Sequence, residues 1–272
     1  MSTNPPDSMA GKRGLVVFGS WRFGTSALCD MIHNHVTGLG IDSVNLSEYL
    51  GCNHYQRDVN GVSTHSVIRE SIPFADGSVS LIRRPTPTYL VRSKLRHLDA
   101  HERRFFIIKM GAEDLLEGND VPIYDHLIND GSVIKIGLNR RDVGAALISL
   151  AMGDYFNIWS YDRSELDRRL GESITPKEIR LGSLRSYSEQ VLWHNDWLHS
   201  NLDLLDQLVW FDQLPTPTIE AIGMSGEART YYAKNHMPHR ERALRYFTNG
   251  EELLRYCDEF EEAMRPLIDR LG

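Results

Sequence analysis

Residues 14–26 carry the clearest structural signal in the chain, Gly14-Leu15-Val16-Val17-Phe18 followed by Gly19-Ser20-Trp21-Arg22-Phe23-Gly24-Thr25-Ser26. The first five residues form a continuous apolar run that is too short for a helix. Such a run is typical of a strand covered on both faces of a parallel sheet. A glycine-bounded turn follows, and from Thr25 onward apolar residues recur along one side of a predicted helix that ends near Val36. The segment therefore predicts a strand, a loop and a helix in direct succession.

The same alternation continues along the chain. Residues 105–109 and 133–136 are two further apolar runs that predict buried strands, and a helical pattern begins near Val143. A later helix is predicted over about 187–205, with a short strand over 207–211. Strands that alternate with helices indicate a parallel sheet with right-handed crossovers. We therefore predict an α/β fold, with a P-loop-like parallel sheet flanked by helices on both faces, in a single domain over residues 13–272.

Other segments show less regular patterns. Residues 1–12 contain Pro, Ser, Asn and Asp without an apolar core, which indicates a flexible tail rather than a signal peptide. Residues 52–104 have three prolines and weak periodicity, so they are expected to form a long excursion that shapes an acceptor site or a plain surface insertion. Residues 160–185 are polar and indicate a peripheral or lid element. The region after Ser225 shows no motif that we can interpret.

Composition limits the classes of function. The chain of 272 residues has a formal net charge of −7, so it shows no sign of a nucleic-acid or anionic-membrane surface. Its three cysteines form no CxxC pair and fit neither a disulfide framework nor a zinc site, which favours a reducing compartment. No apolar run approaches the roughly 20 residues of a membrane span. We therefore expect a cytoplasmic protein.

The loop after the first predicted strand has the spacing of a nucleotide-binding G-x-x-x-x-G-K-[ST] motif. Thr25 stands where that motif has its lysine. Backbone amides of such a loop form a concave nest for anions at the helix N-terminus, and Arg22 adds a forked cation. An ATP-dependent enzyme normally needs the lysine and magnesium. The loop therefore indicates transfer of an anionic group other than ATP-dependent phosphorylation, and the alternative is a glycine-flanked turn with a surface arginine.

A second candidate motif follows the strand predicted over 133–136. Arg141 stands at the start of the next helix, and Ser149 lies eight positions later, about two turns along it. The pair could hold one anionic group only if the arginine side chain reaches forward along the helix. Asp142 has a sufficient structural explanation, because a carboxylate in the first turn complements the helix dipole.

Together, these motifs resemble those of sulfotransferases that use 3′-phosphoadenosine-5′-phosphosulfate (PAPS), and most closely the bacterial trehalose sulfotransferase-like branch. The branch pattern R-S-G-S-T-L-L is matched by Arg22-Phe23-Gly24-Thr25-Ser26-Ala27-Leu28, where Phe23 replaces a small residue. The pattern R-R-D-K-V-A-Q-A-V-S-L is matched without a gap by Arg140-Arg141-Asp142-Val143-Gly144-Ala145-Ala146-Leu147-Ile148-Ser149-Leu150. Glu48-Tyr49 fits the position of the branch's proposed catalytic glutamate, and Lys109 ends a strand as it does in the branch.

The resemblance implies roles for these residues. The first loop would hold the 5′-phosphosulfate, and Arg141 with Ser149 would hold the 3′-phosphate. Glu48 would accept the proton of the acceptor hydroxyl, and Arg22 would stabilise charge on the leaving phosphate. The residues expected to bind the donor PAPS and the product 3′-phosphoadenosine-5′-phosphate (PAP) are Ser20, Trp21, Arg22, Phe23, Gly24, Thr25, Ser26, Arg141 and Ser149.

Several alternatives stay open. The acceptor is a carbohydrate, a glycolipid or a small hydroxylated metabolite, and a homodimer is one open arrangement. His54 is a rival base, because an unperturbed imidazole titrates closer to neutral pH than a carboxylate. A kinase with a degenerate loop and a non-catalytic module that binds PAP are rival functions. Among the eleven histidines, the pairs His33/His35 and His194/His199 are poorly spaced for a shared ion, and no metal is expected.

Overall fold

The computed structural model describes the main α/β body of the chain. The described ranges are 6–20, 22–47, 58–59, 62–63, 70–73, 79–82, 104–111, 127–156, 174–214, 217–225 and 239–272.

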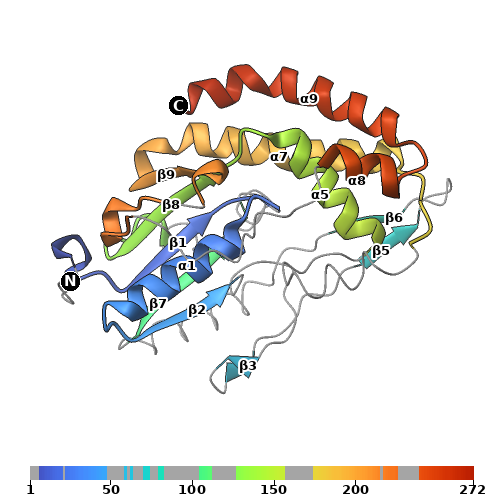
Figure 1. Ribbon diagram of the computed structural model, residues 1–272. Helices are drawn as coiled ribbons and strands as arrows, with labels where there is room; N and C mark the ends of the chain where they lie inside the picture. The colour runs from blue at the N-terminus through green and yellow to red at the C-terminus, as the bar shows by residue number, and fades with distance from the viewer. Residues whose placement is uncertain are drawn as a thin grey trace.

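A sheet of five strands runs through the centre of the molecule in the order β2-β7-β1-β8-β9, and every neighbouring pair is parallel (Figure 1). Its strands are β1 (Gly14–Phe18), β2 (Ser43–Ser47), β7 (Phe105–Met110), β8 (Val133–Asn139) and β9 (Gln207–Trp210). The described helices are α1 (Thr25–Gly38), α5 (Val143–Phe156), α7 (Leu181–Ser200), α8 (His239–Tyr246) and α9 (Gly250–Arg270). This arrangement confirms the predicted α/β class, in which a parallel sheet is flanked by helices.

Alternate residues of the central strands serve two separate cores. In β1, Leu15 and Val17 pack with α1 on one face, whereas Val16 and Phe18 pack on the other face with α5, α7, α8 and α9. Figure 1 shows α1 on one side of the sheet and these four helices gathered on the opposite side. Because both faces are covered, β1 and β8 are buried along their whole length, as their mainly apolar sequences indicate.

The chain changes direction across the sheet between β1 and β8. From β1 it passes through α1 to β2 at one edge, and from β8 it passes through α5 and α7 to β9 at the other edge. In open α/β sheets, ligands bind at such a switch point, beyond the carboxyl ends of the strands. The loop of residues 19–24 and the start of α5 both lie at this position.

Segments that the sequence left undefined form further elements. Within residues 52–104 there are two antiparallel pairs, β3 (Asp58–Val59) with β4 (Val62–Ser63) and β5 (Glu70–Pro73) with β6 (Val79–Ile82). In the segment expected to be a flexible tail, residues 7–9 form a 3₁₀ turn and the Met9 side chain is buried against the α1 core. Part of that segment is therefore packed. Among the described helices, none is long and apolar enough to cross a membrane.

Candidate functional site

The loop between β1 and α1 has an unusual backbone. Arg22 has φ 64° and Gly24 has φ 88°, both in the left-handed region. A non-glycine residue there is uncommon, and such residues concentrate at functional sites. Gly24 is the N-cap of α1, makes no side-chain capping bond, and is followed by a first turn without acidic residues. The positive end of α1 is therefore not neutralised by a carboxylate of its own first turn, as an anion site requires.

Close packing holds this loop in place. The Phe23 ring is fully buried and meets the His194 ring edge-on, with centroids 5.2 Å apart. A Cβ atom on Gly24 would lie 2.7 Å from the Leu214 side chain, so any other residue there would have to displace a neighbouring side chain as well as adopt an unfavourable φ angle. Phe23, where the resembling branch has a small residue, thus anchors the loop to α7 and the core.

The two motifs identified in the sequence meet at Arg22 and Ser149. The Arg22 Nε donates a hydrogen bond to the Ser149 Oγ at 2.7 Å, across 127 positions of sequence. A half-buried, charge-assisted hydrogen bond of this length fixes the direction of a long side chain. The structure therefore brings the loop and α5 together at one point.

Arg141, the other member of the second motif, has different contacts. Its guanidinium donates to both carboxylate oxygens of Asp212 at 3.0 Å and lies 4.0 Å from the Trp210 ring centroid. It also donates to the Gly272 carbonyl at 3.2 Å. Asp142, beside it, directly precedes α5 and accepts from the Ala145 amide at 2.8 Å, so it caps the helix rather than lying within its first turn as expected.

Arg140, the residue before Arg141, lies beside the loop. Its side chain is 4% exposed, and one guanidinium nitrogen donates to the Arg22 carbonyl at 3.1 Å. Its guanidinium stacks 4.2 Å from the Phe211 ring centroid, and a second nitrogen lies 3.5 Å from His239 Nε2. The position of this arginine is set by the amide of Asn139, whose Oδ1 accepts from the Arg140 amide at 2.8 Å.

No motif in the sequence indicated a contribution from α8. His239 and Arg242 lie three positions apart on α8 and therefore on one face of the helix. Arg242 is 8% exposed, and its pKa is lowered by burial and by the charges of Arg22 and, more weakly, Arg140. Three guanidinium groups from three elements thus influence one another at the switch point of the sheet.

A lysine from the neighbouring strand reaches the first turn of α1. Lys109, on β7, donates from its Nζ to the Ser26 Oγ at 2.6 Å. In ATP-dependent loops, the hydroxyl at this position binds magnesium. Here it accepts a hydrogen bond from an ammonium group.

Smaller polar groups complete the loop. Thr25 is buried at the start of α1, and Ser20 is fully buried. Within the part of the chain that the structure describes, the Ser20 hydroxyl has no hydrogen-bond partner. Such a buried hydroxyl can turn toward an anion that enters the loop.

Three residues named from the sequence, Trp21, Glu48 and His54, lie outside the described residues. Glu48 directly follows the last residue of β2 in the sequence. Its proposed role as a base therefore stays a prediction.

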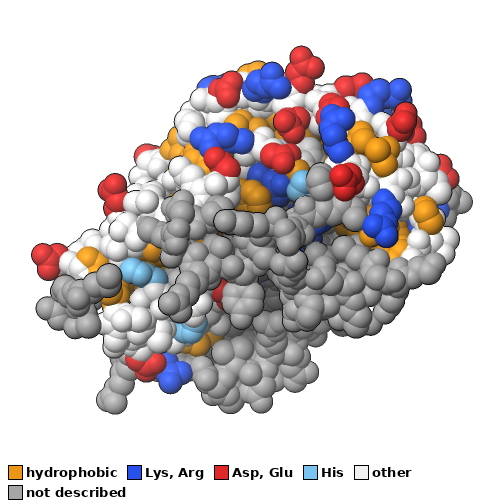
Figure 2. Space-filling view, viewed as in Figure 1, with side chains coloured by type: hydrophobic (Ala, Val, Ile, Leu, Met, Phe, Trp, Pro, Cys, Tyr) orange, Lys and Arg blue, Asp and Glu red, His pale blue; other side chains and the backbone are white. Residues whose placement is uncertain are grey.

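The chemistry of the described site favours an anionic ligand. Arg22, Arg140, Arg242 and Lys109 contribute positive charge from four different elements. Asp142 Oδ2 lies 3.6 Å from the Arg140 guanidinium, but the Asp142 side chain is 59% exposed, so water screens its charge. Figure 2 shows Lys/Arg and His side chains gathered near the centre of one face, beside the undescribed residues. In the described ranges, no group of His, Cys, Asp and Glu could hold a metal ion.

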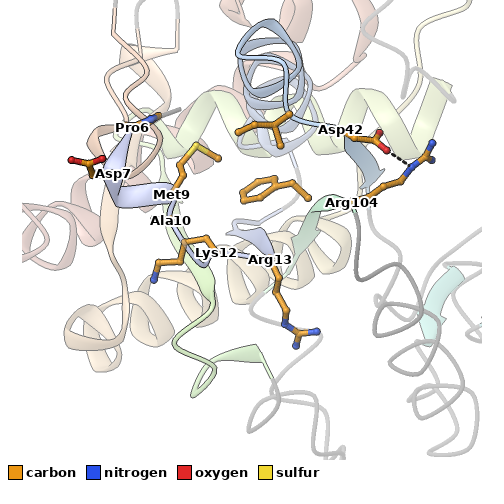
Figure 3. Close-up of a pocket in the computed structure, with 10 residues that line it drawn as sticks. Pro6, Asp7, Met9, Ala10, Lys12, Arg13, Asp42 and Arg104 are labelled. Carbon is orange, nitrogen blue, oxygen red and sulfur yellow. Dashed lines mark hydrogen bonds and ion pairs between the residues drawn. The ribbon is translucent and has the colours of Figure 1, made fainter. Parts of the chain in front are cut away.

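A pocket of about 510 Å³ lies at the opposite, amino end of the strands (Figure 3). Its basic side chains all have partners within the fold. Lys12 donates to the Gly131 carbonyl, Arg13 pairs with Asp130, and Arg104 pairs with Asp42, as the dashed line shows. Ligands of open α/β sheets bind at the other end, so we do not place the chemistry in this pocket.

Comparisons of the chain with models of known protein families, with curated proteins and with solved structures find no match.

Proposed function

We propose that the chain is a sulfotransferase that moves a sulfuryl group from PAPS to a hydroxyl of a carbohydrate, glycolipid or small metabolite. The observation that carries the proposal is the hydrogen bond between Arg22 and Ser149. It joins the two motifs on which the sulfotransferase resemblance depends. A ligand with an anion at each end suits a site to which both motifs contribute.

The donor's phosphosulfate would lie against the loop and the start of α1. Backbone amides there present partial positive charge, and Arg22 presents a full one. The Thr25 and Ser26 hydroxyls can donate to the same group, and Lys109 lies at hydrogen-bond distance from Ser26. These groups are placed before the reaction, so they can stabilise growing charge without rearrangement.

The transfer forms one bond and breaks one. The acceptor oxygen attacks sulfur, and the bond from sulfur to the bridging oxygen of the 5′-phosphate breaks, with its electron pair leaving on PAP. The proton of the acceptor hydroxyl passes to a base, for which the resemblance implies Glu48. Positive groups at the loop favour this step, because negative charge accumulates on the leaving phosphate.

The rival function of a degenerate kinase is less well supported. Thr25 replaces the lysine that such an enzyme directs at the phosphates of ATP. The Ser26 hydroxyl, which would bind magnesium, instead accepts a hydrogen bond from Lys109 at 2.6 Å. Both features favour a donor that is bound without a divalent cation.

Calorimetric titration tests the proposal. The wild-type chain should bind PAP in the presence of EDTA, and Arg22→Met should weaken binding by about 10- to 100-fold, since a hydrogen bond to a charged group contributes about 1.5–3 kcal/mol. Lys12→Met, at the amino end of the sheet, is the matched control and should bind PAP normally. Binding of ATP only with magnesium, and none of PAP, would support the kinase instead.

Turnover needs a second measurement. Labelled PAPS offered with a panel of hydroxylated acceptors should yield a sulfated product, and Glu48→Gln should abolish it while PAP binding is kept. Tight PAP binding by the wild-type chain, without transfer to any acceptor, would indicate the non-catalytic module.

A further inference from the structure

Lys109 stands in a strand whose other five residues are buried and apolar. Those residues belong to the two cores on either side of the sheet, whereas the Lys109 side chain is half-buried. An ammonium group that leaves water in this way costs free energy unless hydrogen bonds replace those to water. The lysine therefore needs a polar partner near the end of β7.

The end of β7 lies beside the loop that follows β1. Lys109 is in register with Val17, two residues before the loop begins at Gly19. The Gly19 amide donates to the Met110 carbonyl at 2.9 Å, which fixes the start of the loop to β7. From this place the Lys109 Nζ reaches α1 and donates to the Ser26 Oγ at 2.6 Å. The lysine thus contacts the first turn of α1 at the anion-binding loop.

The chemistry of this hydrogen bond fixes the direction of the Ser26 hydroxyl. An ammonium group can only donate, whereas a serine hydroxyl can both donate and accept. Whatever other contacts Lys109 makes, the Ser26 oxygen is therefore the acceptor, and the hydroxyl hydrogen points away from the ammonium group. Within the described ranges, the Ser26 hydroxyl makes no other hydrogen bond. Its hydrogen is thus available to a ligand.

Ser26 also offers its backbone amide at the start of α1. The first hydrogen bond inside this helix runs from the Leu28 amide to the Gly24 carbonyl at 3.0 Å. The Ser26 amide comes before that bond and has no carbonyl partner within the helix. Amides in this position point toward an anion bound at the helix N-terminus. One residue can therefore supply two donors to a single anionic group.

We propose that Lys109 is a positioning residue for the donor. It holds the Ser26 oxygen so that the hydroxyl, together with the Ser26 amide, donates to the 5′-phosphate end of PAPS. This inference rests on the proposed function and adds to it a residue that lies outside both motifs. A lysine that served only the packing of β7 would affect stability, without preference for one end of the nucleotide and without dependence on Ser26.

Variants of the two residues, measured alone and together, test this role. Lys109→Met and Ser26→Ala should each lower the affinity for PAP about tenfold in calorimetry, since a hydrogen bond to a charged ligand is misdirected or lost. Because Lys109 acts through Ser26, the double variant should bind PAP within about threefold of Ser26→Ala, whereas independent effects would multiply to about 100-fold.

Two controls separate a local effect from a general one. Adenosine 3′-monophosphate lacks the 5′-phosphate, so the variants should lose no more than about threefold in affinity for it, which also shows that they are folded. Lys135, a buried lysine of β8, donates instead to the Asp130 carbonyl at 3.1 Å, so Lys135→Met should bind PAP normally.

Three results would overturn the role of Lys109. They are normal PAP binding by Lys109→Met, multiplied losses in the double variant, and an equal loss of affinity for both nucleotides. A wild-type chain that binds no PAP would overturn the proposed function as well.

Discussion

The backbone at Arg22 leads to a test that separates folding from binding. Arg22 has φ 64°, a conformation that disfavours every residue with a Cβ atom. In Arg22→Gly and Arg22→Ala, the same charge and the same hydrogen bond to Ser149 are lost. The two variants differ only in the Cβ atom, so their difference in stability reports the backbone conformation.

The size of the difference follows from two opposing effects. The left-handed conformation costs about 1–2 kcal/mol for a residue other than glycine. Against this, glycine lowers the free energy of unfolding by about 0.5–1 kcal/mol relative to alanine, because the unfolded chain with glycine is more flexible. Arg22→Gly should therefore be more stable than Arg22→Ala by about 0.5–1 kcal/mol, although both should bind PAP poorly.

Urea denaturation followed by tryptophan fluorescence measures this difference. With a slope of about 2–3 kcal/mol per molar urea, the midpoints should differ by about 0.2–0.5 M. Arg185, exposed on α7, provides the matched control, because glycine is less favourable than alanine inside a helix by about 1 kcal/mol. If position 22 shows the same order as position 185, its backbone is not left-handed, and the argument for a concave loop fails.

Three further predictions concern the surroundings of the loop. Ser149→Ala should reduce PAP affinity about tenfold in calorimetry, because Arg22 loses the hydrogen bond that directs it, and an unchanged affinity would contradict this role. Gly24→Ala should lower the free energy of unfolding by about 2–4 kcal/mol, through its φ of 88° and a clash with Leu214, and a loss below about 1 kcal/mol in urea would count against the packing described. Burial lowers the pKa of His194 from 6.5 to about 4, so in this interval the unfolded chain binds more protons than the folded one and stability should fall as the pH falls. Compared with His194→Gln, the wild type should lose up to about 1.4 kcal/mol more per pH unit between these values, and equal slopes would show that His194 is not buried in its neutral form.

The central strands could be predicted because their signal is local. The predicted strands over 105–109 and 133–136 are confirmed as β7 and β8, extended by one and three residues. The start of α1 at Thr25 is also confirmed. Continuous apolar runs and a glycine-bounded turn depend on neighbours in the sequence, and both faces of the sheet are covered, so pattern and structure agree.

Elements without a local signal were missed. The prediction did not include β2, and it placed the start of α7 at about 187 rather than at Leu181. The sequence of α8, His-Arg-Glu-Arg-Ala-Leu-Arg-Tyr, is mostly charged and polar and has no long apolar stripe. Burial of Ala243 and Tyr246 against the core on the side of α5 anchors this helix, and such burial is a property of the assembled fold.

The candidate site likewise contains residues that the sequence could predict and residues that it could not. The loop of residues 19–24 and the serine at position 149 could be found from spacing, since a strand, a turn and a helix fix the positions of nearby residues. The spacing of the second motif could not show which of Arg140 and Arg141 lies at the loop. The two residues are adjacent in the sequence, and only the folded backbone determines the direction in which each side chain points. Phe211 and Asp212, about 70 positions later, select one arginine for the loop and the other for the surface. Arg242 lies about 100 positions after Arg140 in the sequence. Only the packing of α8 against the rest of the fold brings it near the loop, and the sequence separation of these residues does not predict that they are close in space.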